Sequence, residues 1–167
     1  LVNLLPEFLE EKHMKIFLHE NTAQKILSEL NWDGSVRKAF CKGNCYADFI
    51  GIVEAGEGKN SGEVEREATL EVSLEEALIK RKLSIFLENK NPSTYSAYLR
   101  ILVNSDSGVG PTEVFSRNER HVVNPEVRGF KDFKEAGIFV EIPAGETKGI
   151  TFSWESGSTH TFEREGE

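Results

Sequence analysis

The alternation of apolar and polar residues is clearest near the C-terminal end of the chain. Residues 138–142 place an apolar side chain at every second position, and residues 150–154 repeat that spacing. Because the side chains of a strand point alternately to its two faces, both stretches predict half-buried strands. Pro143 fixes its own φ for a turn and Gly145 can close that turn, so the two strands should form an antiparallel pair.

Three earlier stretches show the same alternation, and they cover residues 64–74, 79–87 and 95–103. Residues 104–135 are polar and contain several Gly and Pro, so they predict a long crossover with short strands near Val114 and Val122. Strands at this spacing favour a mainly β chain, an antiparallel immunoglobulin-like β-sandwich. The residues expected to face its core are Leu70, Leu83, Ile85, Leu99, Ile101, Val140, Ile150, Phe152 and Trp154.

The N-terminal part predicts helices instead of strands. Residues 4–12 and 21–30 carry apolar side chains at the spacing of one helix face. Asn21 is a suitable N-cap for the second helix, with Gln24 three positions later as in a capping box. A turn at residues 32–34 should end this helix.

A Gly-rich loop at residues 56–62 follows a short apolar strand at residues 48–53, and it predicts a hinge. The strand pattern of the sandwich begins directly after this loop. We therefore expect a small N-terminal α/β segment, residues 1–61, packed on a sandwich that residues 62–167 form.

Composition and charge exclude several classes of protein. The chain has 167 residues, of which 38% are hydrophobic and 29% are charged, and no apolar run is long enough to span a membrane, which predicts a soluble chain. The formal net charge of −8 argues against nucleic acid as a partner, because phosphate binding needs clustered Lys and Arg. The basic triplet 80–82 follows two glutamates and is typical of a solvated strand end.

No pattern in the sequence indicates catalysis or a cofactor. The four His, at positions 13, 19, 121 and 160, are scattered and have no ligand spacing. No Gly-x-Ser-x-Gly elbow is present, and the loop 56–61 lacks the spacing of a phosphate-binding loop. With 28 acidic residues, no catalytic carboxylate pair stands out. We expect no catalytic residues, no cofactor and no metal site.

Cys41 and Cys45 are the sharpest local feature of the sequence. Gly43 and Asn44 lie between them and can adopt the dihedral angles of a tight turn, so the pair can close a small disulfide loop. Two free structural thiols are an alternative. A metal site would need further ligands, and the spacing differs from the Cys-x-x-Cys of redox proteins.

The order of several motifs resembles the C-terminal part of bacterial envelope proteins known as the domain of unknown function 4012 family. The resemblance runs from about residue 8 to residue 155. The motifs that carry it are Lys12-His13, Gln24, Asn31–Gly34, Asp48–Ala55 with the loop that follows, Asn89, Tyr98–Val103, Val140–Glu146 and Thr151-Phe152.

The resemblance implies a parent protein that an N-terminal membrane helix anchors and that faces outward, with a separate domain upstream. The chain begins at Leu1 without a Met, and we expect it to be a piece of such a parent. An extracytoplasmic position in the envelope permits a disulfide, so Cys41 and Cys45 are expected to be bridged. No catalytic residues come with the family.

The leading functional hypothesis is a non-enzymatic envelope module that spaces, docks or binds. Its partner would be a protein or a cell-wall polymer, and it would meet the membrane only through the missing N-terminal anchor. The alternative is an accessory region of an envelope enzyme that acts on cell-wall polymer, with the active site upstream. Within the long crossover, the candidate partner-binding residues are Arg117, Arg120 and Arg128.

Overall fold

The computed structural model describes residue 9 and residues 16–36, 48–56, 63–75, 78–117 and 119–157. The chain divides into two compact units, residues 1–37 and 38–167. Among the described residues, no helix is long and apolar enough to cross a membrane.

The first unit contains helix α2, Asn21–Glu29, whose existence the apolar spacing predicted. Its N-cap is Glu20 and not Asn21, because the Glu20 carboxylate accepts hydrogen bonds from the backbone N–H groups of Thr22 and Ala23 at 2.9 and 2.6 Å. The longer side chain reaches two free N–H groups at once, which the amide of Asn21 does not do here. Gln24 instead accepts from the N–H of Leu18.

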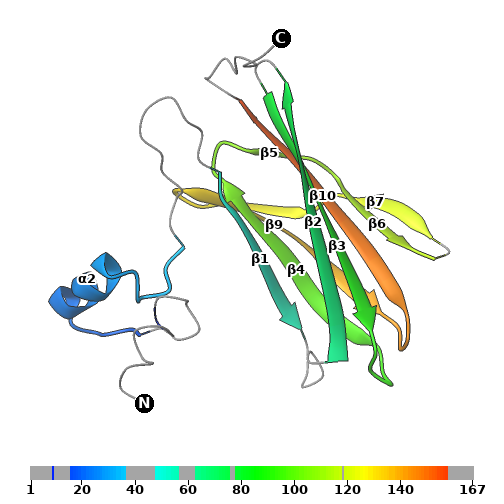
Figure 1. Ribbon diagram of the computed structural model, residues 1–167, viewed down its shortest axis with the longest axis horizontal. Coiled ribbons are helices and arrows are strands. Elements are labelled where there is room, and N and C mark those ends of the chain that lie inside the picture. Colours follow the sequence, from blue (N-terminus) through cyan, green and yellow to red (C-terminus); the bar gives the residue numbers. More distant parts are fainter. Residues whose placement is uncertain are drawn as a thin grey trace, which may run out of the picture. The chain divides into compact units, whose positions relative to one another are not determined.

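The second unit is a pair of antiparallel sheets, as the strand pattern predicted (Figure 1). One sheet has the order β1-β4-β9-β8, and its strands are β1 (Ile50–Gly56), β4 (Tyr95–Asn104), β9 (Phe133–Ile142) and β8 (Glu126–Gly129). The other has the order β2-β3-β10-β6-β7, and its strands are β2 (Val64–Glu75), β3 (Leu78–Asn89), β10 (Thr147–Gly157), β6 (Thr112–Ser116) and β7 (Arg120–Val123). The short β5 (Gly108–Val109) pairs with β10.

The core lies between the two sheets, and β10 is the central strand of its sheet. Ile150 and Phe152 of β10 are fully buried, and the alternate residues Thr151 and Ser153 point to the outer face. Of the nine residues expected to face the core, eight are buried, namely Leu83, Ile85, Leu99, Ile101, Val140, Ile150, Phe152 and Trp154.

Leu70 is the exception, since 44% of its surface is exposed. Its side of β2 is the inward side, as predicted, because it pairs with the buried Leu83 of β3. The prediction of burial was wrong because β2 is the edge strand of its sheet, and alternation shows which way a residue points but not whether anything covers it.

The boundary between the two units also differs from the predicted one at residue 61. β1 pairs with β4 over its full length, from Ile50 opposite Val103 to Gly56 opposite Ala97, so it belongs to the β unit. The compact units therefore divide between Arg37 and Lys38. The strands predicted near Val114 and Val122 are β6 and β7, whereas β5 and β8 were not predicted.

Asn89 fixes the turns at one end of the sandwich. Its buried side chain donates hydrogen bonds to the carbonyls of Ile142, Pro143 and Ser93, at 2.8, 3.1 and 2.8 Å. The turn from β9 to β10 has the predicted form, with Gly145 at a φ of 72°. One amide thereby links the β3-β4 and β9-β10 connections and sets where β10 begins.

Candidate binding surface on the outer face of β10

The outer face of β10 carries only small side chains along most of its length. Gly149, Thr151 and Ser153 alternate on this face, and Glu155 follows them. The neighbouring strands place larger residues beside them, so the central strand forms the floor of a groove. The outward residues of β3 along this groove are Lys80, Lys82, Ser84 and Phe86.

One end of the groove is aromatic. Gly149 lies between Phe86 of β3 and Phe115 of β6, and the two rings meet edge to face with centroids 5.6 Å apart. A Cβ atom on Gly149 would overlap the Phe115 ring, so glycine gives the ring its place above the strand. An edge-to-face pair of this kind contributes about 0.5–1.5 kcal/mol beyond the area that it buries.

The next row across the sheet consists of hydroxyl groups and a carboxylate. Ser84 pairs with Thr151, and their hydroxyl oxygens lie 3.1 Å apart in a hydrogen bond. Glu113 of β6 is the neighbour of Thr151 on the other side, and it accepts from Arg120 at 2.6 Å. Thr151 is only 3% exposed, so the groups of this row that a ligand in the groove can reach are Ser84 and Glu113, both half-buried.

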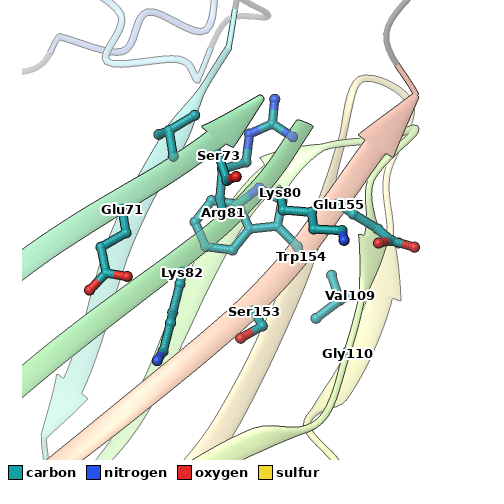
Figure 2. A pocket seen from close by; sticks show the side chains of 12 residues that line it. Glu71, Ser73, Lys80, Arg81, Lys82, Val109, Gly110, Ser153, Trp154 and Glu155 are labelled. Atoms are coloured by element: carbon teal, nitrogen blue, oxygen red, sulfur yellow. The ribbon is translucent and has the colours of Figure 1, made fainter. Parts of the chain in front are cut away.

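Two charged rows complete the surface. Glu71, Lys82 and Ser153 follow one another across β2, β3 and β10, and Figure 2 shows them in this order. In the following row Lys80 is the neighbour of Glu155. The pKa of the Lys80 ammonium is raised, first by its hydrogen bond and ion pair to Glu75 at 2.7 Å and in smaller part by the charge of Glu155. Lys80 therefore stays charged at neutral pH.

Three hollows lie along these rows and share lining residues. The first, of about 730 Å³, lies over the charged rows and has the backbone of Gly108 and Gly110 on one side (Figure 2). The second, of about 480 Å³, lies over Ser84, Thr151 and Glu113, and it shares Lys82 with the first. The third, of about 560 Å³, lies at the aromatic end and shares Phe115 with the second. The three hollows thus adjoin one another along β10, and together they are called the groove.

The structure brings two of the three predicted arginines to this groove. Arg117 and Arg120 line the second hollow, and Arg120 is already paired with Glu113. Arg128 lies in β8 of the other sheet, where it pairs with Glu126 at 2.6 Å. The crossover passes from one sheet to the other between β7 and β8, which separates Arg128 from the other two.

Other predicted features lie elsewhere. Cys41 and Cys45 fall outside the described residues. The side chain of Trp154 is buried in the core, as expected from the sequence, and so it presents no exposed ring to a ligand. Within the described ranges, no group of three or more His, Cys, Asp or Glu is placed to hold a metal ion.

Sequence reasoning missed the floor of the groove. The small residues Gly149, Thr151 and Ser153 were interpreted only as the solvent side of a strand. A signal was present at Gly149, since glycine is depleted in strands and this one lies in a strand whose inward residues are as large as Phe152 and Trp154. The positions of their neighbours depend on pairing between strands far apart in the sequence, which alternation alone does not give.

No protein-family model matches this chain, and a search of curated proteins finds no significant match either.

Proposed function

We propose that this chain is a non-enzymatic binding or spacer module of a membrane-anchored bacterial envelope protein. It acts outside the cytoplasm and binds cell-wall polymer along the outer face of β10. The observation that carries the proposal is the groove itself, in which Gly149, Thr151 and Ser153 form a low floor between residues of β3 and β6. The envelope location rests on the family resemblance.

The chemistry of the groove suits an extended, hydroxyl-rich chain. An apolar sugar face can stack on the aromatic pair of Phe86, which is exposed, and Phe115, which is half-buried, and sugar hydroxyls can pair with Ser84, Lys82 and Glu71. These groups lie in successive rows, so that successive units of a polymer can each meet one row. The groove is open along its length and has no cavity that encloses a ligand.

The sandwich is of the immunoglobulin-like kind in this proposal, which is consistent with two antiparallel sheets and the crossover between them.

Cys41 and Cys45 are bridged in this proposal, as an oxidising compartment permits. Reduction should then raise the intact mass by about two hydrogens without release of a metal, and two thiols that react with an alkylating reagent before reduction would contradict the bridge.

Filling the groove tests the proposal. Ser153→Trp places an indole on the floor of the first hollow, and Lys82→Ala removes a cation shared by two hollows. Both should reduce co-sedimentation with purified cell-wall polymer by about tenfold, which corresponds to about 1.4 kcal/mol. Ser96→Trp is the matched control, since Ser96 lies on the outer face of β4 in the other sheet.

The control should bind the polymer as the unaltered chain does. Equal co-sedimentation of all four proteins, with melting curves that show each to be folded, would contradict the proposed groove. Hydrolysis of the polymer by the purified chain, abolished by one substitution that leaves the fold intact, would contradict the non-enzymatic role.

A further inference from the structure

The edge strand β2 has an unpaired side. It stands at the end of its sheet, and β3 is its only neighbour among the described strands. Over 12 residues, the backbone N–H and C=O groups that point away from β3 therefore have no strand to pair with in the described part of the chain. Edge strands of natural proteins are usually short or otherwise protected against pairing with another chain, so an unpaired edge of this length suggests that a partner strand binds there.

The inward side of β2 is apolar and uncovered. Leu70, Val72 and Leu74 are exposed by 44%, 53% and 56%. Their partners on β3 are all buried. The opposite sheet therefore covers β3 but not β2, although the two strands lie only about 4.8 Å apart.

A short facing strand explains the missing cover. β1, the edge strand of the opposite sheet, has seven residues against the 12 of β2, and its own inward residue Ile52 is 47% exposed. Glu54 of β1 and Arg66 of β2 form a salt bridge of 2.7 Å, which closes one end of the gap between the two edges. Beyond this salt bridge, the apolar row of β2 is open to solvent.

The outward side of β2 is acidic. Its charged residues are Glu65, Glu67, Glu71 and Glu75. Glu65 and Glu75 form ion pairs with Lys90 and Lys80. Glu67 and Glu71 have no ion pair in the part of the chain that the structure describes, although Glu71 lies opposite Lys82 of β3, and both carboxylates are exposed to a ligand.

We propose that the free edge of β2 takes up an extended segment of a partner protein in which apolar residues alternate with lysine or arginine. The added strand would pair with the free backbone groups of β2 and cover its apolar row with one face. Its other face would set cations beside Glu67 and Glu71, since directly opposed charges of opposite sign stabilise paired strands.

A second copy of this chain fits the edge less well. When two copies of β2 pair and continue the sheet, outward residues meet outward residues, and the charged ones are all glutamates. The formal net charge of −8 adds to this repulsion. A basic segment avoids both the repulsion between opposed glutamates and the repulsion between two acidic chains. This inference rests on the edge of β2; it shares Glu71 with the first hollow of the groove, whereas Glu67 lies outside all three hollows.

Two capped peptides test the inference, one alternating valine and lysine and one alternating valine and glutamate. Each should be about ten residues long, which spans most of β2 at roughly 3.4 Å per residue. At about 0.15 M salt, where the Debye length is about 8 Å, the valine-lysine peptide should bind at least tenfold more tightly than the other. On binding, hydrogen exchange should slow at the alternate amides of β2 that point away from β3.

Charge reversal provides the decisive variant. Glu67→Lys combined with Glu71→Lys alters only exposed outward side chains, and it should reverse the preference so that the valine-glutamate peptide binds more tightly. Asp106→Lys combined with Glu141→Lys changes the net charge equally at exposed residues away from β2, and it should keep the original preference.

Three outcomes would overturn the inference. They are absence of binding by either peptide, binding that leaves the β2 amides unprotected, and a preference that Glu67→Lys with Glu71→Lys does not change. Association of the chain with itself through β2, seen as a dimer in sedimentation and lost in Leu70→Lys, would replace the partner strand with a second copy.

Discussion

Arg81 and Asp48 form an ion pair in which Nε of the guanidinium donates to Oδ2 of the carboxylate at 2.5 Å. The Arg81 side chain is fully buried, and it also donates to the carbonyl of Ile79 and the hydroxyl of Ser156. Asp48 precedes β1, so the pair joins the start of one sheet to the interior of the other. The interior of the sandwich therefore contains a buried cation, and Asp48 supplies a counter-charge to it.

Loss of the Asp48 carboxylate should be costly. Asp48→Asn removes a carboxylate that neutralises the buried guanidinium, and we expect a loss of about 3 kcal/mol, at the low end of the range for broken buried pairs because Asp48 is 35% exposed. Glu113→Gln, which breaks the exposed pair with Arg120, should cost less than about 1 kcal/mol. Urea melts of both variants measure the difference, and equal losses would contradict the role of Arg81.

Leu70 and Leu83 are cross-strand neighbours, and so leucine can be replaced by alanine at one exposed and one buried position of the same sheet face. Leu83→Ala removes a side chain that is 3% exposed and should cost about 2–5 kcal/mol. Leu70→Ala removes one that is 44% exposed and should cost less than half as much, since most of its apolar surface stays in water. If denaturant melts give equal losses, then something covers β2 in solution.

Gly149 gives the Phe115 ring its position, and a methyl group there should displace it. Gly149→Ala is expected to separate the Phe115 ring from Phe86 and to cost about 1 kcal/mol, the value of an aromatic pair. Gly129→Ala is the control, because a Cβ at this strand glycine would meet nothing within 4 Å. Thermal melts and the aromatic proton spectrum report both effects, and an unshifted Phe115 signal in Gly149→Ala would contradict the contact.

Acid should weaken the contact between β1 and β2. The pKa of Glu54 lies below its ordinary value of 4.5, first because the Arg66 side chain hydrogen-bonds its carboxylate and further because Tyr95 donates to it. A lowered folded-state pKa contributes stability that is present above the unfolded pKa of about 4.3 and is lost as pH falls through the folded value.

Glu54→Gln should therefore be less stable than the unaltered chain at pH near 7, by about 1 kcal/mol. The gap should close as the pH falls below the unfolded pKa of about 4.3 and on through the lowered pKa of Glu54 in the folded chain. Denaturant melts across this range measure it. Glu67→Gln is the control, because it removes an exposed carboxylate without an ion-pair partner among the described residues, and its stability relative to the unaltered chain should not depend on pH in this way. If the stability difference between Glu54→Gln and the unaltered chain stays constant with pH, the salt bridge of Glu54 does not stabilise the fold.

Alternation of side chains predicted most of the second unit. It located β2, β3, β4, β9 and β10, because a strand with one covered face needs apolar residues at every second position. It did not show that β1 belongs to the sandwich. A Gly-rich loop after a strand can be a hinge between two units or a connection between two strands of the same unit, and the sequence does not distinguish them. Nor did it show that Leu70 is exposed, because the extent of the facing sheet depends on long-range pairing.

The binding surface was harder to predict than the fold. Arg117 and Arg120 were identified from a polar crossover, and they lie beside the groove, whereas Arg128 from the same crossover lies in the other sheet. Residues close in sequence are separated when a crossover changes sheets. The floor of the groove exists because β10 carries no large outward side chains. Small side chains form a groove only where neighbouring strands place larger ones beside them, and the sequence alone does not say which strands are neighbours.

The most direct measurement is a titration of the ¹⁵N-labelled chain with soluble fragments of cell-wall polymer, followed through the backbone amide shifts. The account predicts saturable shifts along the groove, centred on Ser84, Thr151 and Ser153, with fragments of unchanged length at the end. Shifts confined to the outer face of the opposite sheet, no shifts at all, or fragments that become shorter during the titration would contradict it.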